Sequence, residues 1–255
     1  MRKPLMAGNW KMNGTGASAK EFIDALAIDP AVAGKRQALV CAPFTLLPFL
    51  KTYALANRPE LEVGAENVHP EPKGAYTGEI SVEMLWDCGC TFCIVGHSER
   101  REYFGETDRF VNGKMNALLA GGITPIVCVG ETLGQREAGE TRKVVQAQVA
   151  GSIHASANDM DLSSIVVAYE PVWAIGTGKT ATSEQAQEVC SFIRELLGAK
   201  LGTATADGIR ILYGGSMNTK NVDELMSMPD IDGGLVGGAS LKAADFSRLI
   251  AYIEK

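Results

Sequence analysis

The chain has 255 residues, of which 46% are apolar and 21% are charged, and its formal net charge is −6. This length is typical of one α/β barrel, so a single domain is expected over residues 1–255. The acidic balance argues against a nucleic-acid partner, and no apolar run is long enough to predict a membrane span.

Short apolar runs recur along the chain, each followed by a helical pattern, which predicts repeated βα units. The strands are expected to begin near Leu5, Leu39, Leu61, Phe92, Ile123, Ile165, Ile209 and Gly234. Eight parallel strands are the number that closes a (β/α)8 barrel, the fold class predicted here. Active sites of such barrels lie at the carboxyl ends of the strands. The residues that follow each apolar run are therefore the candidates for chemistry.

A lysine follows the first apolar run, within the segment Ala7–Asn13. Burying an ammonium group without a partner is costly, so Lys11 either extends to the solvent or faces an anionic substrate. In the second case Asn9 would supply a hydrogen bond beside it. These residues alone leave both interpretations open.

The segment Glu66–Gly78 is rich in Pro and Gly and is longer than a barrel connection requires. Long loops are usually functional or disordered. The cysteines that come next, Cys88, Cys90 and Cys93, have a spacing unlike that of a standard zinc site, which favours packing roles. The six cysteines and the missing secretory signal together predict a reduced, cytoplasmic protein.

His97 follows the fourth apolar run, where a short helix is expected to start. A helix N-terminus disfavours additional positive charge, so a neutral imidazole is expected. A lone histidine is more often structural, but the expected position of His97 on the same barrel rim as Glu170 favours a functional role. Cys128, at the end of the fifth run, is expected to pack beneath the site, and Glu131 to hydrogen-bond a residue of the segment after Glu170.

Glu170 follows the β-branched run Ser164–Tyr169 and precedes Pro171. A helix start is expected near Thr182, so the residues between them form a glycine-containing loop. A carboxylate held at a strand exit beneath a movable loop can act as a base in a site that excludes water. A P-loop is excluded because that motif requires glycine where Trp173 stands.

Glycine turns follow the last two apolar runs, at Gly214–Ser216 and Gly237–Leu241. Barrels commonly bind phosphate with the loops after strands seven and eight. Glycines allow backbone N–H groups to approach phosphate oxygens closely. The two turns together predict a phosphate site.

Six motifs, AGNWKMN, GAYTGE, VGHSERR, AYEPVWAIGTGKTA, YGGS and GLVGGASL, are spread over most of the chain. Through these motifs the chain resembles the triosephosphate isomerase family over the entire length of the chain. The resemblance implies that Glu170 is the general base and that His97 polarises the substrate carbonyl. It also implies that Lys11 binds substrate and offsets negative charge, with Asn9 beside it and Glu99 close to Lys11.

The resemblance further implies a phosphate cradle, loop-closing residues and a dimer contact. The cradle would comprise Gly176, Ser216, Gly237 and Gly238. Trp173 would belong to the hinge, Ile175 and Leu235 would clamp the base, and Tyr213 and Ser216 would latch the closed loop. Thr77 would reach into a partner subunit of a homodimer. The substrate would be a small triose phosphate, and no metal or organic cofactor would be needed.

Two alternatives stay open at this point. One is another phosphate-binding barrel enzyme, an aldolase or a sugar-phosphate epimerase. An aldolase requires a desolvated Schiff-base lysine within a strand, and Lys11 is the best-placed lysine at a strand exit. The other is a non-enzymatic ligand-binding or adhesion protein.

Overall fold

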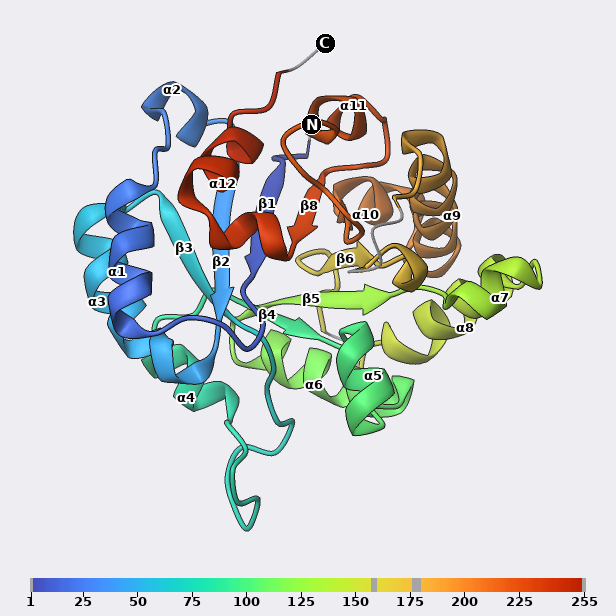
Figure 1. Cartoon of the computed structure of the whole chain (residues 1–255). Coiled ribbons are helices and arrows are strands. Elements are labelled where there is room, and N and C mark those ends of the chain that lie inside the picture. Colours follow the sequence, from blue (N-terminus) through green and yellow to red (C-terminus); the bar gives the residue numbers. More distant parts are fainter. Residues whose placement is uncertain (1, 157–159, 176–179, 254–255) are drawn as a thin grey trace.

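The computed structural model describes residues 2–156, 160–175 and 180–253. Its strands form one closed parallel barrel in chain order (Figure 1). They are β1 (Leu5–Asn9), β2 (Gln37–Ala42), β3 (Leu61–Ala65), β4 (Phe92–Val95), β5 (Thr124–Val129), β6 (Val166–Tyr169), β7 (Arg210–Tyr213) and β8 (Gly233–Val236). β8 pairs with β1 and closes the barrel, with Leu5 opposite Gly233. The predicted (β/α)8 fold is confirmed, and the largest error in a strand start is two residues, Leu39 for Gln37.

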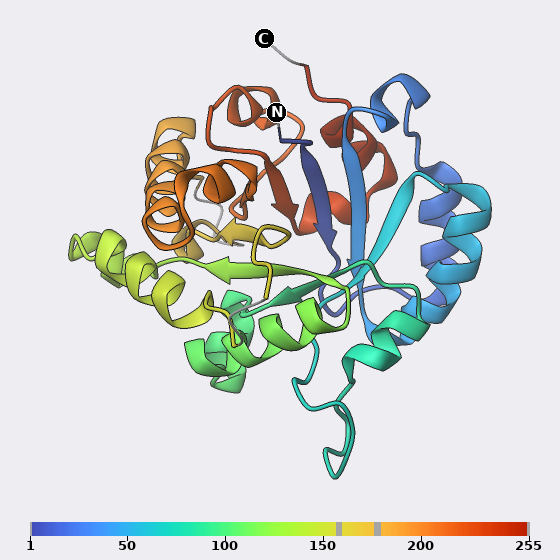
Figure 2. The ribbon, with the colours of Figure 1, turned by 180° about the vertical axis from the view of Figure 1, so that it is seen from behind.

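Helices surround the barrel on all sides in both views (Figures 1 and 2). The α-helices are α1 (Gly16–Ala25), α2 (Pro30–Ala33), α3 (Leu47–Asn57), α4 (Val82–Asp87), α5 (Ser98–Phe104), α6 (Asp108–Ala120), α7 (Leu133–Glu137), α8 (Thr141–Ser152), α9 (Ser183–Leu201), α10 (Thr203–Gly208), α11 (Val222–Met226) and α12 (Ala243–Ile250). Three short 3₁₀ helices, η1 (Phe44–Leu46), η2 (Val172–Ala174) and η3 (Gly238–Leu241), follow β2, β6 and β8. α9 begins where predicted, because Thr182 caps it and forms a capping box with Gln185.

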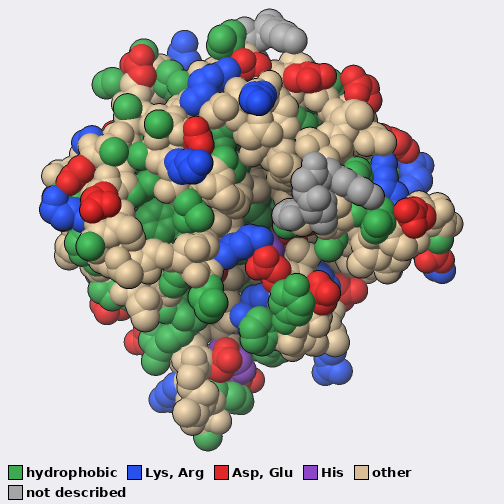
Figure 3. All heavy atoms as spheres, viewed as in Figure 1, with side chains coloured by type: hydrophobic (Ala, Val, Ile, Leu, Met, Phe, Trp, Pro, Cys, Tyr) green, Lys and Arg blue, Asp and Glu red, His purple; other side chains and the backbone are tan. Residues whose placement is uncertain are grey.

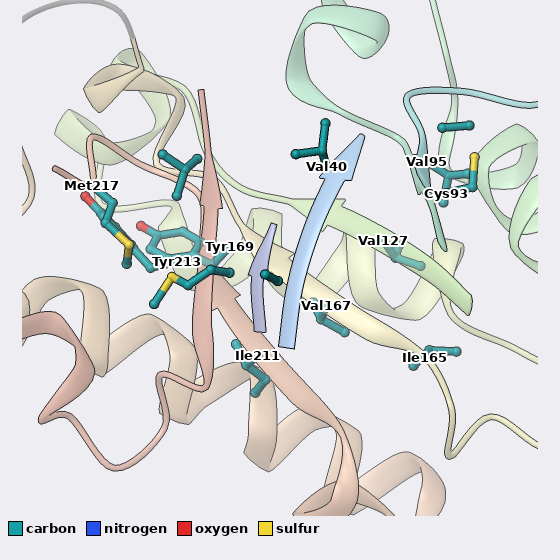
Figure 4. Close-up of a cluster of buried hydrophobic side chains, with 14 of the residues drawn as sticks. Val40, Cys93, Val95, Val127, Ile165, Val167, Tyr169, Ile211, Tyr213 and Met217 are labelled. Atoms are coloured by element: carbon teal, nitrogen blue, oxygen red, sulfur yellow. The ribbon is translucent and has the colours of Figure 1, made fainter. Parts of the chain in front are cut away.

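The strands are apolar on both faces because each face packs against a different layer. Residues such as Leu39, Ile126 and Leu212 point into the barrel and form an inner core. Alternate residues such as Val40, Val127 and Val167 pack outward against the helices (Figure 4). Continuous apolar strands are the expected pattern for a parallel sheet that is covered on both sides.

The segment between β3 and α4 projects from the body of the molecule (Figure 1). The rings of His69 and Tyr76 lie 4.3 Å apart across it, and the backbone N–H of His69 donates to the backbone carbonyl of Ile80. Thr77 is exposed on this projecting segment. The segment is therefore an ordered extension with internal contacts.

Candidate active site

A cavity of about 430 Å³ lies at the carboxyl ends of the strands. Figure 3 shows this face, where basic, acidic and histidine side chains meet at its hollowed centre. The structure places nine of the residues that the sequence singled out on the cavity wall: Asn9, Lys11, His97, Glu170, Ile175, Ser216, Leu235, Gly237 and Gly238. Gly176 lies outside the described residues. Barrel closure therefore brings together residues from most of the chain's length.

Glu170 and His97 contact each other directly. Glu170 follows β6 and is 2% exposed, and its Oε1 lies 2.8 Å from Nε2 of His97. Its Oε2 accepts the backbone N–H of Ser98 at 2.9 Å. His97 is the N-cap of α5, and its Nδ1 accepts the backbone N–H of Glu99 at 3.2 Å. A ring nitrogen that accepts an N–H carries no proton, so this arrangement suits a neutral imidazole with its hydrogen on Nε2.

The contact also shifts the pKa of each partner. Burial alone would raise the pKa of Glu170, but His97, the Ser98 N–H and Lys11 outweigh it, and the pKa is lowered. Burial alone would lower the pKa of His97, but the Glu170 carboxylate outweighs it, and the pKa is raised. The sequence argument considered only the helix start and missed this upward shift. The Nδ1 hydrogen bond favours the neutral ring, whereas the Glu170 contact opposes it.

Lys11 is held in an uncommon backbone conformation. Its φ is 54°, and it is the one non-glycine residue with positive φ in the part of the chain that the structure describes. Its Nζ donates to Oε1 of Glu99 at 2.5 Å, and its backbone N–H donates to Oδ1 of Asn9 at 3.2 Å. A left-handed backbone costs about 1–2 kcal/mol, so surrounding contacts must maintain it. Lys11 thus lines the cavity, and its side chain is paired with Glu99 beside it.

Two glycines make room for Glu170. A Cβ on Gly130 would lie 1.7 Å from the carbonyl oxygen of Glu170, and a Cβ on Gly214 would lie 2.9 Å from its Cγ. Any other residue at Gly130 would displace the backbone that carries the carboxylate. Gly130 was not recognised as a site residue from the sequence. The feature of the sequence that could have identified Gly130 is a glycine directly at a strand exit, where the backbones of two strands approach closely.

Cys128 lies beneath the site, as its position at the end of the fifth apolar run suggested. It is completely buried in the inner core. Burial raises the pKa of its thiol, and the charge of Glu170 raises it further. A thiol with a raised pKa is a poor nucleophile at neutral pH.

The two glycine turns lie side by side on the cavity wall. Ser216 follows β7, Gly237 lies between β8 and η3, and Gly238 is the first residue of η3. The indole N–H of Trp10 donates to the carbonyl of Ser240 at 3.1 Å, which ties the β1 exit to η3. The Ser240 hydroxyl donates to the carbonyl of Gly237 at 2.7 Å. These contacts fix the shape of the second of the two turns that the sequence assigned to phosphate.

A second carboxylate, Glu131, lies behind the segment that carries Glu170. It is completely buried, and its Oε1 accepts the indole N–H of Trp173 at 3.0 Å. The predicted hydrogen bond from Glu131 to the segment after Glu170 is confirmed by this contact. Glu131 also accepts hydrogen bonds from Tyr169 and Arg136, two residues that the sequence analysis did not single out.

Tyr213 ends β7 with a fully buried side chain. Burial raises the pKa of its hydroxyl to about 12, with the backbone of Ala181 opposing the rise. No hydrogen bond of normal geometry reaches the hydroxyl from the residues that the structure describes, although the backbone of Ala181 lies close enough to affect its pKa. A buried hydroxyl without a well-formed hydrogen bond costs free energy.

The described side chains include no group of three or more His, Cys, Asp and Glu residues arranged to hold a metal ion. None of the described helices is long and apolar enough to cross a membrane.

Residues 4–253 match the family model for triosephosphate isomerase. A triosephosphate isomerase of Herpetosiphon aurantiacus is 52% identical over 252 residues, which cover 99% of this chain and all of the relative. One of Endomicrobium trichonymphae is 53% identical over 255 residues, and one of Moorella thermoacetica is 51% identical over 253, each covering 99% of both chains. With a closed eight-stranded barrel and matches over nearly the full length, the chain belongs to the triosephosphate isomerase family.

Proposed function

We propose that the cavity interconverts dihydroxyacetone phosphate and D-glyceraldehyde 3-phosphate, a step of glycolysis and gluconeogenesis. The observation that carries the proposal is the meeting of Glu170, His97 and Lys11 on one cavity, with base and imidazole 2.8 Å apart. Moving a proton between adjacent carbons requires a base, an electrophile and stabilisation of oxyanions. Each of the three side chains supplies one of these.

Glu170 takes the proton from one carbon and returns it to the neighbouring carbon. The Nε2–H of His97 donates a hydrogen bond to the carbonyl oxygen on which negative charge develops. Lys11 adds a positive charge at the same wall and Asn9 a hydrogen bond. For this to occur, the substrate must enter between Glu170 and His97 and replace their mutual contact.

The phosphate of the substrate is held by the turns after β7 and β8. Ser216, Gly237 and Gly238 line this side of the cavity. A firm hold on the phosphate disfavours its elimination from the enediolate. The buried Tyr213 hydroxyl, which has no hydrogen bond of normal geometry to the described residues, supports a latch that the segment after Glu170 completes when substrate is bound.

A homodimer is proposed from the exposed apolar side chains on one side of the molecule. Met12 is 96% exposed, Tyr103 is 70% exposed and Phe104 is 67% exposed. All three line a cavity of about 460 Å³ beside Lys11. Exposed apolar clusters of this kind mark association surfaces, and a two-fold pair would let the projecting segment with Thr77 enter this cavity of its partner.

The free cysteines are consistent with a cytoplasmic location.

The test is a coupled assay of both triose phosphates in both directions with purified protein. Interconversion that disappears in Glu170→Gln supports the proposal. Borohydride treatment in the presence of substrate tests the aldolase alternative, because it traps a lysine Schiff base. A covalent adduct at Lys11, or an active protein that isomerises only longer sugar phosphates, would overturn the proposal.

A further inference from the structure

The buried carboxylate of Glu131 holds the chain on both sides of the catalytic base. The Tyr169 hydroxyl donates to it from β6 at 3.1 Å, and the Trp173 indole N–H donates from η2 at 3.0 Å. The backbone carbonyl of Glu131 accepts the N–H of Val172 at 3.1 Å. Tyr169 directly precedes Glu170, and Trp173 lies three residues after it. Glu131 therefore holds the residues immediately before and after the catalytic base in place.

Arg136 is the cation that compensates Glu131. Its Nη1 lies 3.0 Å from Oε1 of Glu131, and its guanidinium carbon lies 4.6 Å from the ring centroid of Trp173. A buried carboxylate without a cationic partner is strongly destabilised. A guanidinium over an indole face adds a cation–π attraction. Arg136 thus stabilises Glu131 by charge and Trp173 by stacking at the same time.

Trp173 forms part of the wall of another cavity, which lies behind Glu170. This cavity is about 510 Å³ in volume and is also lined by Ser98, Cys128, Leu133 and Glu170 itself. Because the indole forms part of this wall, a displacement of the indole would change the space open to water next to the base. Water at the carboxylate weakens its basicity and gives a reactive intermediate a route to solvent.

We propose that Arg136 is a positioning residue for the isomerase reaction, which acts through Glu131 and Trp173 to hold in place the wall of the cavity behind Glu170. Arg136 lies on α7, outside the residues that line the substrate cavity. Its effect on the base is therefore indirect. The inference rests on the proposed function, because it assigns Arg136 a task in that reaction.

The test compares Arg136→Met with Arg142→Met. Arg142 lies nearby on α8, and its guanidinium stacks on Phe192 at 4.3 Å, so both substitutions remove a cation from an aromatic face. We expect Arg136→Met to lower kcat by about tenfold with KM changed less than about twofold, because the lost contacts orient the base without touching substrate. We expect Arg142→Met to match the wild type.

The second readout is the fraction of turnovers that end in methylglyoxal. In this side reaction the enediolate expels phosphate with the electron pair of its C–O bond, and the remaining enol tautomerises. Arg136→Met should raise this fraction several-fold, which a general loss of folded enzyme would not do. Arg136→Lys keeps the charge beside Glu131 and should restore part of the lost kcat.

Each outcome decides a different statement. A wild-type protein without isomerase activity overturns the proposed function. An active wild type with equal kcat and equal methylglyoxal fraction in Arg136→Met and Arg142→Met overturns the role of Arg136. If Arg136→Met does not fold, Trp173→Phe tests the same path, because it removes the indole N–H to Glu131 and keeps an aromatic ring. An unchanged methylglyoxal fraction in Trp173→Phe also overturns the inference.

Discussion

The Nε2 atom of His97 lies 2.8 Å from Oε1 of Glu170, so that the two proposed catalytic side chains contact each other across the cavity. The contact satisfies a buried carboxylate in the absence of substrate, and it lowers the pKa of that carboxylate. A substrate that enters between them removes the imidazole from the carboxylate. Burial is then the main influence on Glu170, and its pKa rises.

Replacing Glu170 by glutamine should remove most turnover. The amide cannot accept a proton, and the expected loss in kcat is about 10²–10⁴-fold, the usual contribution of a general base. Protection of the variant by inorganic phosphate against thermal unfolding should stay near the wild-type level. Glu137→Gln, which changes an exposed acid of α7, is the matched control. Near-normal kcat in Glu170→Gln would remove this carboxylate from the mechanism.

Truncating Ile175 or Leu235 to alanine should lower the pKa of Glu170 in the complex with an enediolate analogue. Both aliphatic side chains line the same cavity as Glu170. They exclude water from the carboxylate when substrate is bound, and exclusion of water raises the pKa of an acid. The measurement is the pH dependence of analogue affinity, or an isotope-edited carboxyl stretch. An unchanged pKa in both variants would show that these side chains do not tune the base.

The substitution Phe104→Arg should convert the protein to a monomer with lower activity. Phe104 belongs to the exposed apolar surface that we assign to the dimer, and burying an additional cation there is unfavourable. Leu55→Arg is the control, because Leu55 is 66% exposed on α3. Sedimentation at the assay concentration measures the oligomeric state of each variant, and kcat is measured at the same concentration. A Phe104→Arg monomer with full activity would contradict a site that requires both subunits.

The free energy of unfolding should decrease as the pH rises from about 4.5 to about 8, because Glu66 ionises over this range. The pKa of Glu66 is raised from 4.5 to about 8, mainly by burial and also by the charge of Glu99, while Lys11 opposes the rise. Its Oε1 has no hydrogen-bond partner among the described residues. An acid whose pKa rises on folding stabilises the fold fully below its unfolded pKa. That contribution is lost as the pH rises through the folded pKa.

Glu66→Gln should remove this pH dependence. At neutral pH the variant should gain up to about 3 kcal/mol in the free energy of unfolding relative to the wild type, since one pKa unit corresponds to about 1.4 kcal/mol. Thermal unfolding of both proteins at pH 5 and pH 8 measures the difference. Glu71→Gln, at an exposed acid of the projecting segment, should leave the wild-type profile unchanged. Parallel profiles for wild type and Glu66→Gln would refute the assignment.

The sequence by itself determined the order and approximate limits of the strands, because each strand is a short apolar run between turn residues. It also made Glu170 and His97 candidates, because each follows such a run and barrel exits share one rim, whereas the role of Lys11 was implied by the family resemblance. The start of α9 was predictable from Thr182 and Gln185, since capping depends on neighbours three residues apart. These features depend on local rules that act within a few residues.

Only the tertiary structure decided how these residues act on one another. The Lys11–Glu99 ion pair joins residues 88 positions apart, and the hydrogen bond from Ser98 to Glu170 joins residues 72 apart. The shift of the His97 pKa depends on the Glu170 contact, which no local pattern encodes. The role proposed for Arg136 likewise depends on Trp173, which barrel closure places against it. Charges and hydrogen bonds act over a few ångströms of space, and the path of the folded chain alone sets those distances.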